Sequence, residues 1–226
     1  MRRLLYAPVI HMSADLGEIS SKVSEKGIAH IGEGLWAAHM KTVDGFWFVL
    51  ADFFGRIEAK GLKIYQDGML ANGDIGRRIV DDAVRKGSRN FEIIADLMKR
   101  GALLVKTEDI GLLKRERDLL HSLGRARTFG ERLINFLKYR LARNGLLRAR
   151  DRFMAERIDK TLAVGETGVL FVGAYHDVRR WLPADIEVIE IKDREKVRDY
   201  HRKFISCRRG LEPLKKYLLS PVQVRV

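Results

Sequence analysis

Apolar runs that end abruptly in polar residues divide the chain into short strands. Residues 4–10 form one such run, which His11 and a polar stretch follow, and this pattern predicts a buried strand and then a loop. Similar runs end in polar or ionisable residues further along the chain. They predict strands at 62–65, 102–106, 168–172 and 186–191.

Between these runs, apolar residues recur at helical spacing. Trp47, Leu50 and Phe54 lie three to four residues apart, which predicts an amphipathic helix over 44–60. Comparable patterns predict helices at 20–40, 74–85, 88–101, 110–123, 130–147, 149–163 and 193–204, with a basic tail after the last. Strands separated by helices are typical of βαβ units. We therefore expect an α/β fold in a single domain over 1–226, with a mainly parallel or mixed sheet of about five strands flanked by helices.

Composition narrows the class of protein. The 226 residues are 46% hydrophobic with four prolines, as expected for a folded chain. The single Cys207 excludes an intramolecular disulfide and a cysteine-based zinc site, and it suits a reducing compartment, so a cytoplasmic location is expected. The most apolar stretch, 46–54, is interrupted by Asp52 and is too short to cross a bilayer, so no membrane span is expected.

The positive charge lies in two segments. The formal net charge is +13, of which residues 111–150 carry +8 and residues 192–226 carry +7, and the rest of the chain is nearly neutral. The first segment is predicted to be a basic helical insertion, and the second a basic C-terminal segment. Clustered lysine and arginine favour an anionic partner, so nucleic acid or another anionic surface is one candidate ligand.

Ionisable residues follow four of the predicted strands. These are His11, Asp67, Glu108 with Asp109, and His176, and Asp15 comes four residues after His11. If the strands are parallel, their carboxyl ends meet at one edge of the sheet, where open α/β sheets bind ligands. The sequence therefore predicts an active cleft at this edge.

Two imidazoles among carboxylates suit two kinds of chemistry. A histidine oriented by a carboxylate can act as a general base that activates water. The same groups can instead hold a divalent cation such as Mn, Zn or Co, with His11, Asp15, Asp67 and His176 as ligands. Arg150, at the start of the predicted helix that precedes the fourth strand, is the candidate to hold an anionic group or to orient a carboxylate.

These motifs resemble the TraB/PrgY and Tiki group within the erythromycin-esterase-like and ChaN-like superfamily. The resemblance rests on the late motif Gly173-Ala174-Tyr175-His176 and on Arg150-Asp151 at the head of a helix. The early motif carries Pro8 in place of the family's glycine before His11, and Asp67 stands where the family has a glutamate. The resemblance covers most of residues 1–191. It implies a hydrolase-like cleft, and members of the superfamily include esterases, metal-dependent peptidases and haem-binding proteins.

Three functions follow as hypotheses. The first is a hydrolase acting on a small-molecule or peptide substrate, with His11, Asp67, Glu108, Arg150 and His176 as its catalytic residues. The second is a protein that binds nucleic acid or another anionic surface through its basic segments. The third is a haem or small-ligand carrier, with haem ranking below a divalent metal as a cofactor. Any of the three is compatible with a homo-oligomer.

Overall fold

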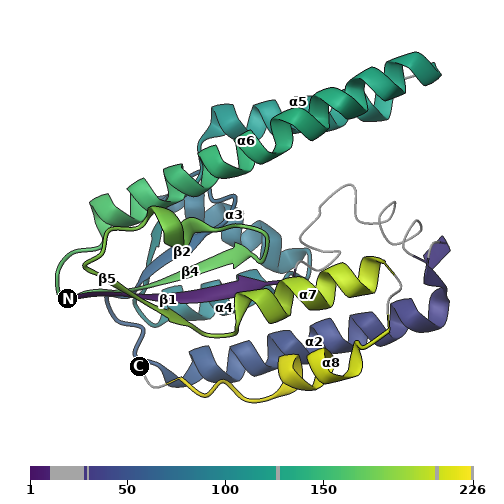
Figure 1. The fold of residues 1–226 in the computed structure, drawn as a ribbon. Coiled ribbons are helices and arrows are strands. Elements are labelled where there is room, and N and C mark those ends of the chain that lie inside the picture. The colour runs from purple at the N-terminus through teal and green to yellow at the C-terminus, as the bar shows by residue number, and fades with distance from the viewer. Residues whose placement is uncertain (11–27, 30, 126–127, 207–208, 225–226) are drawn as a thin grey trace.

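Five parallel strands form the centre of the molecule (Figure 1). The computed structural model describes all residues except 11–27, 30, 126–127, 207–208 and 225–226. The sheet order is β3-β2-β4-β1-β5, and every pair of neighbouring strands is parallel. The strands are β1 (Arg2–Val9), β2 (Lys63–Gln66), β3 (Leu103–Val105), β4 (Thr167–Gly173) and β5 (Ile186–Glu190). The predicted α/β class and parallel sheet are confirmed.

Helices connect the strands, as the alternating pattern predicted. Their bounds are α2 (Glu33–Arg56), α3 (Gly73–Arg85), α4 (Arg89–Lys99), α5 (Ile110–Arg125), α6 (Phe129–Thr161), α7 (Arg194–Ile205) and α8 (Glu212–Leu219). A short 3-10 helix, η2 (Val178–Trp181), lies between β4 and β5.

The two faces of the sheet are covered unequally. Successive residues of β1 face opposite sides, so Leu5 and Ala7 pack with α2, α4, α7 and α8, whereas Leu4 and Tyr6 pack against the C-terminal half of α6. The α6 side chains on this second face are Met154, Ala155, Ile158 and Leu162. Because both faces are covered, β1 and β4 are apolar almost throughout, which explains why their sequences show no alternation.

The segment 33–56 forms one helix, whereas two helices, at 20–40 and 44–60, were predicted. The part of the first that precedes residue 28 lies outside the described residues. Asp44-Gly45 resembles a helix boundary in sequence, but Gly45 lies where α8 approaches α2, since a Cβ atom there would overlap the end of the Leu219 side chain of α8. The glycine therefore marks a close approach between helices and not an end.

The segment 129–161 is also one helix, α6, where two had been predicted with a break near residue 148. No helix-breaking residue stands at that point, and the side chains change there from exposed to buried. The N-terminal half of α6 pairs with α5 and projects away from the sheet, and only the C-terminal half packs on it (Figure 1). We call α5 together with residues 129–149 of α6 the arm.

The predicted basic tail contains an additional helix, α8. Pro213 lies in its first turn, and Leu214, Tyr217 and Leu218 follow at helical spacing with Leu218 fully buried. The helical spacing of these apolar residues was present in the sequence, but the segment was interpreted as a basic tail because of its lysines. Among the described residues, no helix is long and apolar enough to cross a membrane.

Candidate functional site

Four of the predicted site residues come together at the carboxyl edge of the sheet. Asp67 follows β2, Glu108 follows β3 and His176 follows β4, while Arg150 reaches them from α6. All four side chains are buried, with Glu108 completely enclosed. The convergence that parallel strand ends predict is therefore observed for these residues.

Arg150 is bound by three carboxylates. Its Nη2 lies 2.7 Å from Asp67 Oδ1 and 2.7 Å from Glu108 Oε2, and its Nε donates to the same Glu108 oxygen at 3.0 Å. Its Nη1 donates to Glu116 of α5 at 2.8 Å. Every nitrogen of the guanidinium therefore has a carboxylate acceptor, and Arg150 ties the ends of β2 and β3 to α6 and to the base of the arm.

His176 is held between two further carboxylate contacts. Its Nδ1 lies 2.5 Å from Asp151 Oδ1, and its Nε2 lies 3.2 Å from Asp67 Oδ2. The second oxygen of Asp151 accepts the backbone N–H of Asp177 at 3.0 Å. Asp151 thereby fixes both the imidazole ring and the turn that carries it, and Asp67 joins His176 to Arg150.

The titration of these groups follows from their burial and charge. Burial alone would lower the pKa of His176, but the carboxylates of Asp67 and Asp151 favour the charged ring and raise its pKa to about 9. Burial raises the pKa of Glu108, and the Arg150 guanidinium opposes that shift. His176 is thus an imidazolium at neutral pH, held in a buried site.

Backbone contacts keep the strand ends in place. The Asp67 N–H donates to the Phe171 carbonyl of β4 at 2.9 Å, so the β2 end stays joined to β4 beyond the last ladder pair. The N–H groups of Thr107 and Glu108 both donate to the Met69 carbonyl, at 2.9 and 3.1 Å. Asp67 and Glu108 are therefore placed by main-chain bonds and do not depend on side-chain packing alone.

A second set of contacts holds the carbonyl group of His176. The Tyr6 hydroxyl of β1 donates to it at 3.2 Å, and Arg194 Nη1 of α7 donates to it at 2.8 Å. The same guanidinium nitrogen lies 3.0 Å from Asp177 Oδ1. A strand of the sheet and the start of α7 therefore fix the position of the His176 residue.

The remaining predicted residues lie elsewhere. His11 and Asp15 fall outside the described residues, so their placement stays a prediction. Asp109 accepts the Leu112 N–H at 2.9 Å and caps the first turn of α5. It therefore stabilises the helix start next to Glu108.

Sequence reasoning missed two members of the cluster. Asp151 was predicted only as part of the head of a helix, yet it is buried in mid-helix against His176. Glu116 was not singled out at all, because its partner Arg150 is 34 residues away and no local pattern links them. The sequence offered one signal for Asp151, because this carboxylate directly follows the candidate arginine.

Two of the four predicted metal ligands, His11 and Asp15, lie outside the described residues, so the divalent-metal site stays a prediction. Arg150 and the imidazolium of His176 already neutralise the carboxylates that such an ion would use, and both His176 nitrogens are engaged. Within the described ranges, no group of three or more His, Cys, Asp or Glu side chains is placed to hold a metal.

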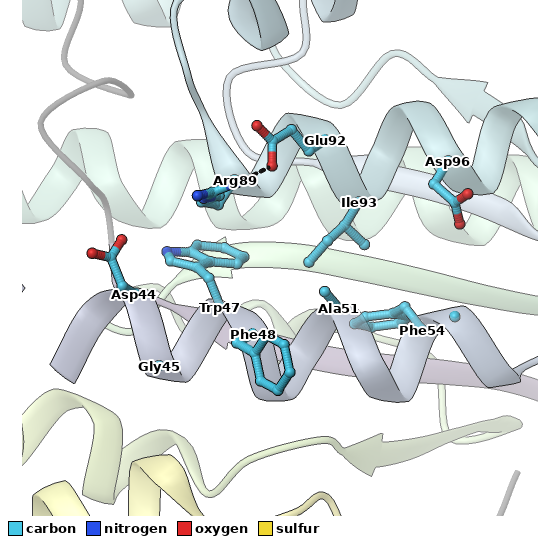
Figure 2. Close-up of a pocket in the computed structure, with 11 residues that line it drawn as sticks. Asp44, Gly45, Trp47, Phe48, Ala51, Phe54, Arg89, Glu92, Ile93 and Asp96 are labelled. Carbon is cyan, nitrogen blue, oxygen red and sulfur yellow. Dashed lines mark hydrogen bonds and ion pairs between the residues drawn. The ribbon is translucent and has the colours of Figure 1, made fainter. Parts of the chain in front are cut away.

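A separate groove lies between α2 and α4, on the face of the sheet opposite to α6 (Figure 2). It has a volume of about 570 Å³. Its floor includes the side chains of Trp47 and Ile93, and Asp44, Glu92 and Asp96 lie along its rim. Glu92 is paired with Arg89 at 2.9 Å, and Asp96 is paired with Arg100 at 2.8 Å. None of the residues that line the groove belongs to the cluster formed by Arg150, His176 and their carboxylate partners.

Comparison of the chain with protein-family models, with curated proteins and with solved structures found no significant match. The resemblance to the TraB/PrgY and Tiki group therefore stays a prediction.

Proposed function

We propose that the protein is a hydrolase-like enzyme whose reaction takes place at the carboxyl edge of the sheet. The observation that carries the proposal is the arrangement of His176, a buried acid–base group between two carboxylates. Open α/β sheets bind their ligands at this edge. Strongly shifted histidines in such positions are candidates for proton transfer.

His176 is the proposed general acid. Asp151 holds the ring through Nδ1, which leaves the Nε2 side as the position where a proton is exchanged. Asp67 faces Nε2 at 3.2 Å and keeps the proton on the ring until a leaving group takes it. A group with a pKa of about 9 is protonated at neutral pH and so can donate.

Arg150 is a positioning residue in this proposal. All its nitrogens already donate to carboxylates, so it holds Asp67 in place and does not act as the predicted substrate anion holder. Glu108 balances the guanidinium charge from a completely buried position. The substrate class expected is a small-molecule or peptide ester, amide or phosphoester.

The test is a hydrolase screen of the purified chain with ester, peptide and phosphoester substrates, with and without Mn²⁺, Zn²⁺ or Co²⁺. We expect His176→Gln and Asp67→Asn to lower turnover by about 100-fold or more, because a general acid commonly contributes that much. Wild-type turnover should fall as pH rises through about 9, where His176 loses its proton.

The matched control is His121→Gln, which changes an exposed histidine of α5. It should keep the wild-type activity. Circular dichroism and thermal unfolding establish that each variant is folded. A folded His176→Gln protein with wild-type turnover on the identified substrate would overturn the proposal, as would a screen in which the wild-type chain hydrolyses none of the three classes under any metal condition.

A further inference from the structure

The arm shows an unusual distribution of side chains for a helical hairpin. Of its described side chains from Ile110 to Ala149, none is buried. The two helices contact each other, and Asn135 Nδ2 of α6 donates to the Ser122 carbonyl of α5 at 2.8 Å. The arm extends beyond the sheet (Figure 1).

One face of α6 in the arm packs against α5. Asn135, Tyr139, Ala142 and Leu146 are half-buried and recur at helical spacing, in line with the Asn135 contact to α5. The opposite face must therefore point away from α5. A polar surface would be the ordinary composition for such a face.

The outward face is apolar instead. Leu133, Leu137 and Leu141 lie four residues apart and thus on one side of the helix, and each is at least 47% exposed. Ile134 and Phe136, on the flanks of the same face, are also exposed. Five large apolar side chains within nine residues make a contiguous patch of the kind that marks an interaction site.

Basic residues lie on the flanks of this face. Residues 132–149 contain five arginines or lysines and no acidic residue. Lys138, Arg140 and Arg143 are exposed, and none of the ion pairs found among the described residues involves them. The partner of this patch must therefore be both apolar and negatively charged.

We propose that this outward face of α6 binds peripherally to an anionic lipid bilayer. A helix with leucine and phenylalanine on one side, flanked by lysine and arginine, has the composition of helices that lie in the membrane interface. The apolar residues enter the headgroup boundary, and the long basic side chains reach the lipid phosphates.

Two other occupants fit the face less well. A second copy of the chain would oppose two basic faces. The acidic residues Glu92 and Asp96 of the α2–α4 groove are already paired with Arg89 and Arg100. A nucleic acid would satisfy the basic residues, since phosphate contacts dominate its binding. It would leave the leucine side chains exposed.

The test is co-sedimentation of the full chain with vesicles of phosphatidylcholine alone or of phosphatidylcholine with phosphatidylserine. We expect binding to the anionic vesicles to be about tenfold or more stronger, and to weaken with salt. Binding to the anionic vesicles should be lost in two double variants, Leu137→Ser/Leu141→Ser and Lys138→Glu/Arg140→Glu. These positions are exposed, so the fold should survive, which circular dichroism verifies.

Matched controls change the same chemistry elsewhere. Phe48→Ser removes an exposed aromatic side chain of α2, and Arg77→Glu/Arg78→Glu reverses two exposed charges on α3. Both should bind anionic vesicles as the wild type does. Equal binding to the two vesicle types, or loss of binding in the controls, would overturn the proposal.

The competing occupants give distinct results. Duplex DNA binding that survives Leu137→Ser/Leu141→Ser, without vesicle binding, would assign the basic face to nucleic acid. A concentration-dependent dimer in analytical ultracentrifugation that the same variant abolishes, again without vesicle binding, would assign it to a second copy. Either result would replace the lipid proposal.

Discussion

Two buried arginines bind carboxylates at opposite edges of the same sheet. Arg2, at the amino end of β1, donates to Asp159 of α6 at 2.8 Å and to Asp185 before β5 at 2.7 and 2.8 Å. Arg150 binds Asp67, Glu108 and Glu116 at the carboxyl edge. Each guanidinium side chain is only 10% exposed.

The carboxylates of the two clusters differ in their access to water. Asp159 and Asp185 are 47% and 59% exposed, whereas Asp67 and Glu108 are 9% and 0% exposed. At the amino edge only the arginine is desolvated, and its bonds join β1 to α6 and to the segment before β5. At the carboxyl edge both signs of charge are removed from water, which apolar packing would achieve at lower cost. Such an expensive arrangement is expected where it serves chemistry.

The largest effect should come from Arg150→Met. Removing the guanidinium leaves Glu108 and Asp67 as buried carboxylates without their main counter-charge, so we expect a loss of about 3–5 kcal/mol in the free energy of unfolding. Urea denaturation at neutral pH measures it. If the loss comes from the uncompensated charge, Arg150→Met/Glu108→Gln should recover part of the stability. A double variant less stable than Arg150→Met would show that packing, and not charge, holds this edge together.

The next effect is a pH dependence that only the carboxyl edge should show. The pKa of His176 is raised from an ordinary value near 6.5 to about 9 in the fold. Its stabilisation is therefore fully present below about pH 6.5 and is lost as pH rises through about 9, up to about 3 kcal/mol in total. His176→Gln should remove this dependence.

Unfolding curves of both proteins at a series of pH values between about 6 and 10 measure it. Lys192, whose pKa burial lowers to about 8, titrates in the same window but contributes equally to both proteins. The difference between wild type and variant therefore isolates His176. A difference that stays constant across the series would contradict the assignment of a raised pKa.

The carboxyl edge was partly predictable from sequence because strand ends are local features. Apolar runs followed by Asp67, Glu108 and His176 placed these residues correctly, and parallel strands must bring their ends to one edge. The strand order was not predictable in this way, since it depends on contacts between distant segments. The local pattern therefore placed these three side chains at the carboxyl edge but did not identify their partners.

The partners within the cluster depend on how α6 is rotated against the sheet. Arg150 and Asp151 are adjacent in sequence and point in directions about 100° apart on the helix, so one reaches Asp67 and Glu108 while the other reaches His176. No periodic pattern specifies that rotation, and the predicted break near residue 148 concealed the continuous helix. The Arg2 cluster was not predicted either, because the acceptors of Arg2 lie 157 and 183 residues away in the sequence.

The smallest effect should come from Arg2→Met, the counterpart of Arg150→Met at the amino edge. Its exposed carboxylate partners regain water when the arginine is removed, so we expect a loss of about 1–2 kcal/mol in the free energy of unfolding. Because Asp159 and Asp185 face solvent, added salt should shrink this loss, whereas salt should leave the loss from Arg150→Met nearly unchanged. Urea denaturation of both variants at low and high sodium chloride makes the comparison. A loss from Arg2→Met equal to that from Arg150→Met, and equally insensitive to salt, would mean that the exposure of the partner carboxylates does not distinguish the two edges. Burial of both charges would then not set the carboxyl edge apart as a place for chemistry.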